Sequence, residues 1–152
     1  RGEDGRIYPW GNKPPTHNLA RYRQIWTKEI KHHVMVPVDL FTEGASPYGV
    51  HHMAGNVKEW VDDWFDREYY DDPANHINPK GQIGGEYKVL RGGSWRDLTG
   101  FIYSSFRNNA YPDSRLDDYG FRCAKSVESK GKTKQLTKLL VREAPLKRYV
   151  SY

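Results

Sequence analysis

Hydrophobic positions along the chain are gathered in short runs that polar turns separate. Four runs have the composition and alternation of β-strands, and they span residues 57–64, 87–91, 103–107 and 120–124. Clusters of Gly, Pro, Asn and Asp stand between these runs, for example Asp-Asp-Pro at residues 71–73. The pattern predicts short strands joined by long irregular loops, as in an α+β domain.

The two ends of the chain differ from this middle region. Residues 1–47 are rich in turn-forming residues, and within them only residues 24–30 have the pattern of a short helix. We assign residues 1–126 to one domain and residues 127–152 to a basic tail. Apolar residues in the tail give it a means of docking on a partner: Leu136, Leu139, Leu140, Val141, Leu146 and Val150.

Large aromatic rings must supply much of the core. The chain has 152 residues, which suits one domain, and only 37% of them are hydrophobic. It nevertheless holds 5 Trp and 11 Tyr, whose side chains can bury a large area each. We therefore expect Trp60 and Trp95, which stand beside glycine-containing turns, to be largely buried.

Positive charge is concentrated at the C-terminal end. The formal net charge is +5, but residues 125–152 alone carry eight Lys and Arg against two Glu, a local charge of +6. The rest of the chain is nearly neutral and shows no basic face with interleaved aromatics, so nucleic-acid binding is not expected outside the tail. No apolar run reaches the roughly 18 residues of a membrane span, so we expect no span in this chain.

The chain has a single cysteine, Cys123, which excludes a disulfide within the chain. One cysteine without histidines at suitable spacing also cannot form a structural zinc site. We expect a buried, unreactive thiol at this position.

Four sequence motifs occur in a fixed order. Gly-Arg-Ile-Tyr-Pro-Trp-Gly at residues 5–11 comes first, and the stretch at 48–60, which contains Ala-Gly-Asn-Val-Lys-Glu-Trp, predicts a tight turn that enters a half-buried strand. Val-Leu-Arg-Gly-Gly-Ser-Trp at 89–95 reads as a strand that runs into paired glycines. Asp-Asp-Tyr-Gly-Phe-Arg-Cys-Ala at 117–124 reads as a turn and a final strand.

In this order and spacing, the motifs resemble those of the formylglycine-generating enzyme, or sulfatase-modifying factor, family. The resemblance runs from residue 1 to about residue 126 and implies an irregular, loop-rich α+β fold related to C-type lectins. It favours a periplasmic or secreted location. Family domains have a further N-terminal portion, so we expect a stable core only when that portion or a protein partner covers the chain.

The resemblance also bears on catalysis. Oxidising members of the family bind copper through two cysteine thiolates that follow the Gly-Gly-Ser motif, and soft sulfur ligands suit that metal. The matching positions here are Asp97 and Ile102. A carboxylate is a hard ligand and an isoleucine is no ligand, so we expect neither copper nor oxidation of a peptide cysteine by the family mechanism.

Calcium is the other metal that the resemblance implies. One family site matches Asn18 and Leu19, with Glu29 as the only nearby carboxylate, and a second matches the set His52, Gly55, Val57 and Glu59. Calcium prefers oxygen ligands, so an imidazole at His52 should weaken or abolish the second site.

Other candidate chemistry is weaker. His32-His33 and His51-His52 are adjacent pairs, and neighbours in an extended segment point in opposite directions, so neither pair alone makes a bidentate metal site. An acidic run follows Trp60, and it is either a solvated loop or a cation site: Asp62, Asp63, Asp66, Glu68, Asp71 and Asp72.

Taken together, these features favour a non-catalytic binding or scaffold module, a pseudoenzyme within a larger assembly that retains the family fold. Its partner would be another protein or a further part of the same domain, with the basic tail as a docking segment. The alternative is part of an enzyme with different chemistry on the same fold, such as an iron-dependent sulfoxide synthase. Those enzymes place most of their histidine ligands in an upstream domain.

Overall fold

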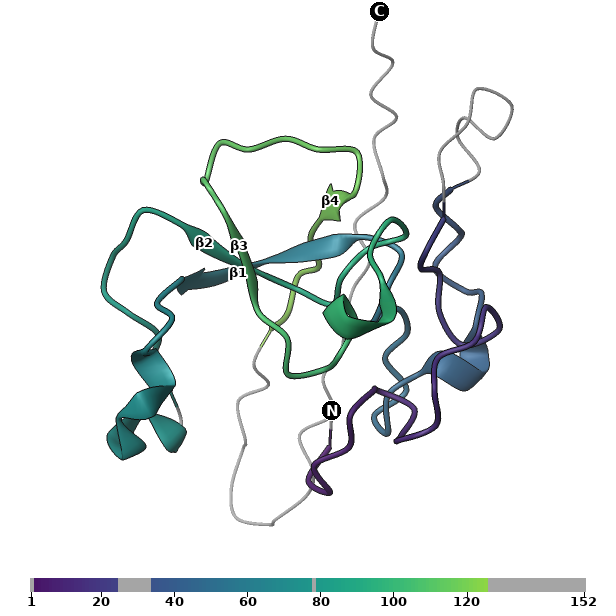
Figure 1. Ribbon diagram of the computed structural model, residues 1–152, viewed down its shortest axis with the longest axis horizontal. Helices are drawn as coiled ribbons and strands as arrows, with labels where there is room; N and C mark the ends of the chain where they lie inside the picture. Colours follow the sequence, from purple (N-terminus) through teal and green to yellow (C-terminus); the bar gives the residue numbers. More distant parts are fainter. Residues whose placement is uncertain (1, 25–33, 78, 126–152) are drawn as a thin grey trace, which may run out of the picture. The chain divides into compact units, whose positions relative to one another are not determined.

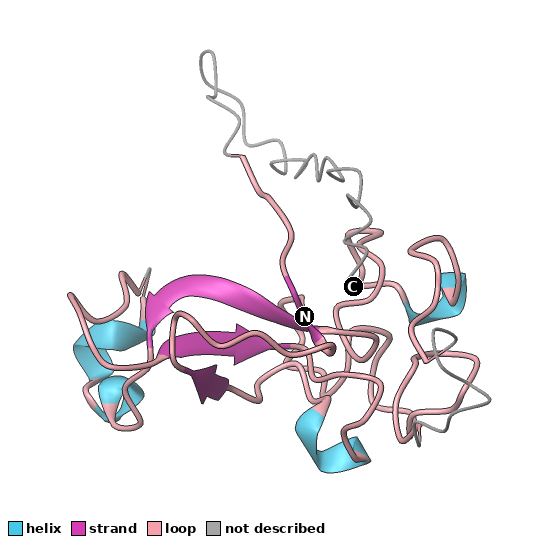
Figure 2. Cartoon of the chain, turned by 90° about the horizontal axis from the view of Figure 1, so that it is seen from above, coloured by secondary structure: helices cyan, strands magenta, loops and turns pink. Residues whose placement is uncertain are grey.

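The computed structural model describes residues 2–24, 34–77 and 79–125. These residues form four short strands and a few short 3-10 helices, joined by loops that make up most of the chain, as Figure 2 shows. The strands are β1 (Lys58–Trp64), β2 (Lys88–Arg91), β3 (Asn108–Ala110) and β4 (Tyr119–Gly120). The 3-10 helices are η2 (Thr42–Gly44), η3 (Tyr69–Asp71), η4 (Pro73–His76) and η5 (Thr99–Phe101).

The strands form one mixed sheet in the order β3-β2-β1-β4 (Figure 1). β1 pairs antiparallel with β2, with Trp60 opposite Leu90, and β2 pairs antiparallel with β3. β4 runs parallel to β1 for two residue pairs, so the first residue of β1, Lys58, lies opposite Tyr119. Segments about 60 residues apart in the sequence therefore meet at the start of β1.

The predicted strands at 57–64 and 87–91 are confirmed as β1 and β2. The strand predicted at 103–107 is wrong, because the sheet uses Asn108–Ala110 instead. The guanidinium of Arg91 donates hydrogen bonds to the carbonyls of Ser104, Ser105 and Phe106, at 2.6 to 2.9 Å. Because the Arg91 side chain binds these carbonyls, the backbone hydrogen bonds between β2 and β3 begin only at Asn108.

The final strand is also shorter than predicted. β4 ends at Gly120, and Phe121 is 69% exposed. Cys123 follows outside the sheet and is exposed, so the prediction of a buried thiol is wrong. Because β4 pairs through only two residues, the residues after Gly120 have no strand partner that would hold Cys123 against the core.

The core lies around the Gly-Gly-Ser-Trp turn and one face of the N-terminal loops. Trp95, Leu90 and Ile102 are almost completely buried, and Ile102 belongs to a cluster with Tyr8, Ala20, Tyr22 and Ala54. The predicted burial of Trp95 is confirmed. Trp60 is half-buried and meets the ring of Tyr119 edge-on at a centroid distance of 5.5 Å, so its predicted burial is confirmed only in part.

The chain divides into two units, Arg1–Phe121 and Arg122–Tyr152. The predicted helix at 24–30, apart from Gln24, and the basic tail at 127–152 lie outside the described residues. Within the described ranges, no helix has the length and apolar character needed to cross a membrane.

Candidate functional site

A tight turn after β2 presents the first residues of the site. Gly93 has a φ of 67°, and a Cβ at this position would lie 2.6 Å from the carbonyl oxygen of Phe101. Only glycine fits such a conformation and approach without a shift of its surroundings. The turn then brings Asp97 back onto Ser94, since Asp97 Oδ2 accepts from the Ser94 amide at 2.8 Å and from its hydroxyl at 3.0 Å.

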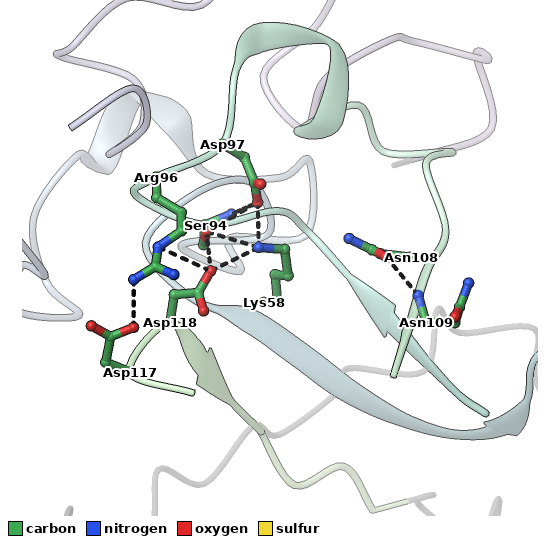
Figure 3. A network of polar contacts seen from close by, with 8 residues as sticks. All are labelled: Lys58, Ser94, Arg96, Asp97, Asn108, Asn109, Asp117 and Asp118. Carbon is green, nitrogen blue, oxygen red and sulfur yellow. Dashed lines mark hydrogen bonds and ion pairs between the residues drawn. The ribbon is translucent and has the colours of Figure 1, made fainter. Parts of the chain in front are cut away.

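Lys58 enters this turn from the start of β1. Its Nζ lies 2.7 Å from Asp97 Oδ2, 2.7 Å from Asp118 Oδ2 and 3.1 Å from Ser94 Oγ. Figure 3 shows the ammonium group between the two carboxylates. We call Lys58, Ser94, Asp97 and Asp118 the Lys58 cluster; it joins β1, the turn after β2 and the residue before β4.

The Lys58 cluster is shielded from water. The side chains of Lys58 and Asp118 are 8% and 1% exposed, and Asp97 is 17% exposed. On the outer side, Arg96 binds Asp117 at 2.7 Å and comes within 3.9 Å of Asp118, with its guanidinium over the Trp95 ring (Figure 3). One buried and one partly buried carboxylate thus meet a buried ammonium and a nearby guanidinium, which keeps the buried charges paired.

The neighbours set the ionisation of the Lys58 cluster. Burial alone would raise the pKa of Asp118, but hydrogen bonds from Lys58 and Ser94, with the charges of Lys58 and Arg96, outweigh burial and lower that pKa. Burial alone would lower the pKa of Lys58, but hydrogen bonds to Asp118 and Asp97 raise it. Lys58 and Asp118 are therefore both charged at neutral pH.

A serine beside a lysine could in principle serve as a nucleophile and its base. That chemistry needs a neutral amine and an accessible hydroxyl. Lys58 is protonated, and Ser94 is completely buried and hydrogen-bonded to two carboxylates. The geometry is therefore that of a structural ion cluster.

The two positions that the resemblance matches to thiolates lie in different environments. Asp97 directs its carboxylate into the Lys58 cluster. Ile102 is completely buried and packs in the hydrophobic cluster with Tyr8 and Tyr22. Neither side chain offers a sulfur ligand.

The predicted calcium residues fall in two places. Asn18 is exposed, the Leu19 carbonyl lies against Gly44, and Glu29 is outside the described residues. At the second place, His52 and Gly55 have positive φ values of 52° and 77°, and the Gly55 amide donates to the Gly92 carbonyl at 2.8 Å. Val57 lies against Gly120, and Glu59 is half-buried in β1. Calcium at these positions stays a prediction.

The remaining candidates give no metal cluster. His51 and His52 are half-buried, whereas His32 and His33 lie outside the described residues. In the acidic run, Asp72 accepts from the Ala74 amide at the start of η4, and Asp66 accepts from the Glu68 amide. Across the described part of the chain, no group of three or more His, Cys, Asp and Glu residues could hold a metal ion.

Sequence reasoning missed Lys58 and Asp118. One signal was available: Lys58 stands two residues before Trp60 in a half-buried strand, so both side chains point to the same face. A lysine on such a face needs a buried counter-charge. The partner could not be found this way, because Asp118 is 60 residues away in the sequence.

The sulfatase-modifying factor enzyme 1-like domain matches residues 1–127. The chain is 33% identical over 134 residues to the formylglycine-generating enzyme of Mus musculus, covering 81% of this chain and 35% of that protein. It is 34% identical over 130 residues to hercynine oxygenase of Mycolicibacterium smegmatis, covering 80% of this chain and 28% of the oxygenase. Serine/threonine-protein kinase pkn1 of Chlamydia caviae is 42% identical over 85 residues, covering 55% of this chain and 14% of the kinase. Among solved structures, Treponema denticola variable protein 1 superposes with a TM-score of 0.57 at 26% identity, covering 77% of this chain and 40% of that one.

Few helices, a curled mixed sheet and long loops define the class as a small, loop-rich domain of the formylglycine-generating-enzyme type. The chain belongs to the sulfatase-modifying factor enzyme 1-like family, as the motifs predicted. It spans between about a seventh and about a third of the length of the curated relatives described above.

Proposed function

We propose that this chain is a non-catalytic binding or scaffold module of its family. One observation carries the proposal: the two positions matched to copper thiolates hold a carboxylate bound to Lys58 and a completely buried isoleucine. A carboxylate that neutralises a buried ammonium cannot leave it without a large cost in stability. Asp97 therefore serves the fold.

Copper(I) binding tests this proposal at the site itself. The full chain, residues 1–152, is titrated in competition with a chromophoric copper(I) chelator, beside a Cys123→Ser variant, because Cys123 is an exposed thiol. We expect wild-type protein to bind copper(I) only through Cys123, so the variant should bind none with appreciable affinity. Tight binding that survives Cys123→Ser would contradict the proposal.

Two further observations support a binding role. Similar segments occur in proteins with different names, an oxygenase and a kinase among them, which supports a fold that serves more than one purpose. The relation to C-type lectins that the resemblance implies fits a module whose loops bind a partner. We also propose a periplasmic or secreted location and, as partner, another protein or a further part of the same domain.

The similarity to hercynine oxygenase favours a second candidate, part of an iron-dependent enzyme of sulfoxide-synthase type. Most of the iron ligands would then come from a region outside this chain. The test is iron content of the whole natural protein, purified without chelators. Stoichiometric iron with oxygen uptake in the presence of a thiol substrate would favour this candidate over a binding module.

Calcium binding is a separate proposal. At the second predicted place, His52 supplies nitrogen where calcium prefers oxygen. A His52→Asp variant should therefore gain a calcium-dependent rise in melting temperature that exceeds any rise in the wild-type protein. Equal responses of the two proteins to calcium would show that residue 52 is not a ligand.

A further inference from the structure

The end of the sheet opposite the Lys58 cluster carries unusually exposed apolar side chains. Ile83 is 105% exposed and Ile77 is 81% exposed, whereas the other exposed large hydrophobic residues of the described chain range from 37% to 69%. Both lie in the connection from the end of β1 to the start of β2, the teal segment of Figure 1. We call residues 68–77 and 80–86 the end surface.

The backbone of the end surface enforces the exposure of Ile83. Gln82 forms a β-bridge with Trp64, which holds the loop on the last residue of β1. A Cβ at Gly81 would lie 2.9 Å from Asp63 Oδ1, and one at Gly85 would lie 3.3 Å from Trp64 Cβ. The loop therefore contacts β1 on both sides of Ile83. Ile83 itself lies between these contacts and is fully exposed.

The end surface carries more negative than positive charge. Residues 68–77 and 80–86 hold four Asp and Glu but only one Lys, a net −3 in a chain whose total is +5. Glu68, Asp71, Asp72 and Glu86 are exposed on this stretch. Two neighbouring cations already have partners. Lys88 binds Asp62 and lies over the Trp64 ring at 4.2 Å, and Arg107 lies over the Tyr70 ring at 4.8 Å and donates to the Asp66 carbonyl. The end surface thus combines exposed isoleucines with exposed carboxylates.

We infer that the end surface is a docking site for a protein segment that is basic and apolar, with Ile83 as its central anchor. An exposed apolar side chain that leaves water on binding favours affinity. The exposed carboxylates select a partner of opposite charge and disfavour an acidic one. The inference deepens the proposed binding function and rests on it, but it concerns a surface remote from Asp97 and Ile102.

Two synthetic amphipathic peptides of equal length test this chemistry, one of Leu and Lys and the other of Leu and Glu in the same order. Each is titrated against the whole natural protein by fluorescence anisotropy. We expect the Leu/Lys peptide to bind and the Leu/Glu peptide not to bind. Ile83→Ser should weaken the Leu/Lys complex at least tenfold, equivalent to about 1.4 kcal/mol. Glu68→Gln with Asp71→Asn should reduce both affinity and salt dependence.

Ile7→Ser is the matched control, because Ile7 is 46% exposed and lies outside the end surface. It should leave the Kd within twofold, and circular dichroism should show all variants folded. Equal loss for Ile7→Ser and Ile83→Ser, unchanged binding of Ile83→Ser, equal binding of both peptides, or binding of neither would overturn the inference. Copper(I) binding is independent of these titrations, so the docking site and the proposed function can fail separately.

Discussion

At the scale of residues, Lys58 decides how the site behaves. Its ammonium is buried, and its two nearest carboxylates come from turns distant in the sequence. Removal of one partner from a buried ion pair typically costs about 3–5 kcal/mol, because it leaves a charge without compensation. We therefore expect the Lys58 cluster to stabilise the fold only while all its charged partners are present.

Stability should depend on pH through the Lys58 cluster. The pKa of Asp118 is lower in the folded chain, so its stabilising contribution is present above the unfolded pKa and is lost as pH falls through the folded value. The pKa of Lys58 is raised, so its contribution is present below its ordinary value of 10.5 and is lost as pH rises through the folded value. Urea unfolding of the wild-type protein should show falling stability below about pH 4 and above about pH 10.5.

Two variants test the acid limb. Asp118→Asn should flatten it, and Asp113→Asn, which changes an exposed carboxylate outside the Lys58 cluster, should leave it unchanged. An acid limb of the same steepness in Asp118→Asn and in the wild-type protein would show that other carboxyl groups govern acid unfolding.

The bond between Lys58 and Asp97 can be measured by a double-mutant cycle. Lys58→Met, Asp97→Asn and the double variant are unfolded in urea at pH 7. Residues in direct contact within one network typically couple by about 0.5–3 kcal/mol, and we expect a favourable value in this range. Strictly additive losses in the two single variants would mean that the ion pair does not stabilise the fold.

At the scale of elements, the sequence pattern predicts strands well only where packing agrees with it. β1 and β2 follow from runs of aromatic and β-branched residues, and Val89 and Leu90 are buried as such a run requires. The residues at 103–107 have a similar composition, but Arg91 binds three of their carbonyls. Such competition depends on a side chain from another strand, so no local pattern contains it.

The two tryptophans of the motifs should differ in energetic weight. Trp95 is 1% exposed, and Trp95→Ala should cost roughly 3 to 5 kcal/mol, the range for a large aromatic in a core. Trp60 is half-buried on the sheet beside Tyr119, so Trp60→Ala should cost clearly less. The midpoints of urea unfolding measure both losses, and an equal or larger loss for Trp60→Ala would contradict the difference in burial.

At the scale of the whole molecule, the resemblance read from four motifs is confirmed by the family match over residues 1–127. Two of the motifs support the fold directly, because Asn56 bonds both backbone groups of Val36 and the Trp95 amide donates to the Asn56 carbonyl. The Lys58 cluster was not predictable in the same way. Lys58, Ser94 and Asp118 come from three motifs, Asp97 follows one of them, and only the folded sheet brings all four within bonding distance.

The function of the whole chain is tested most directly by conversion of a sulfatase-type cysteine peptide. The full chain is incubated with peptide, oxygen, copper and a reductant, with the formylglycine-generating enzyme of Mus musculus as positive control, and the products are read by mass spectrometry. Asp97 and Ile102 leave no thiolate pair, so we expect the peptide to keep its thiol while the control converts it. Aldehyde formation above the copper-only blank would contradict a non-catalytic role.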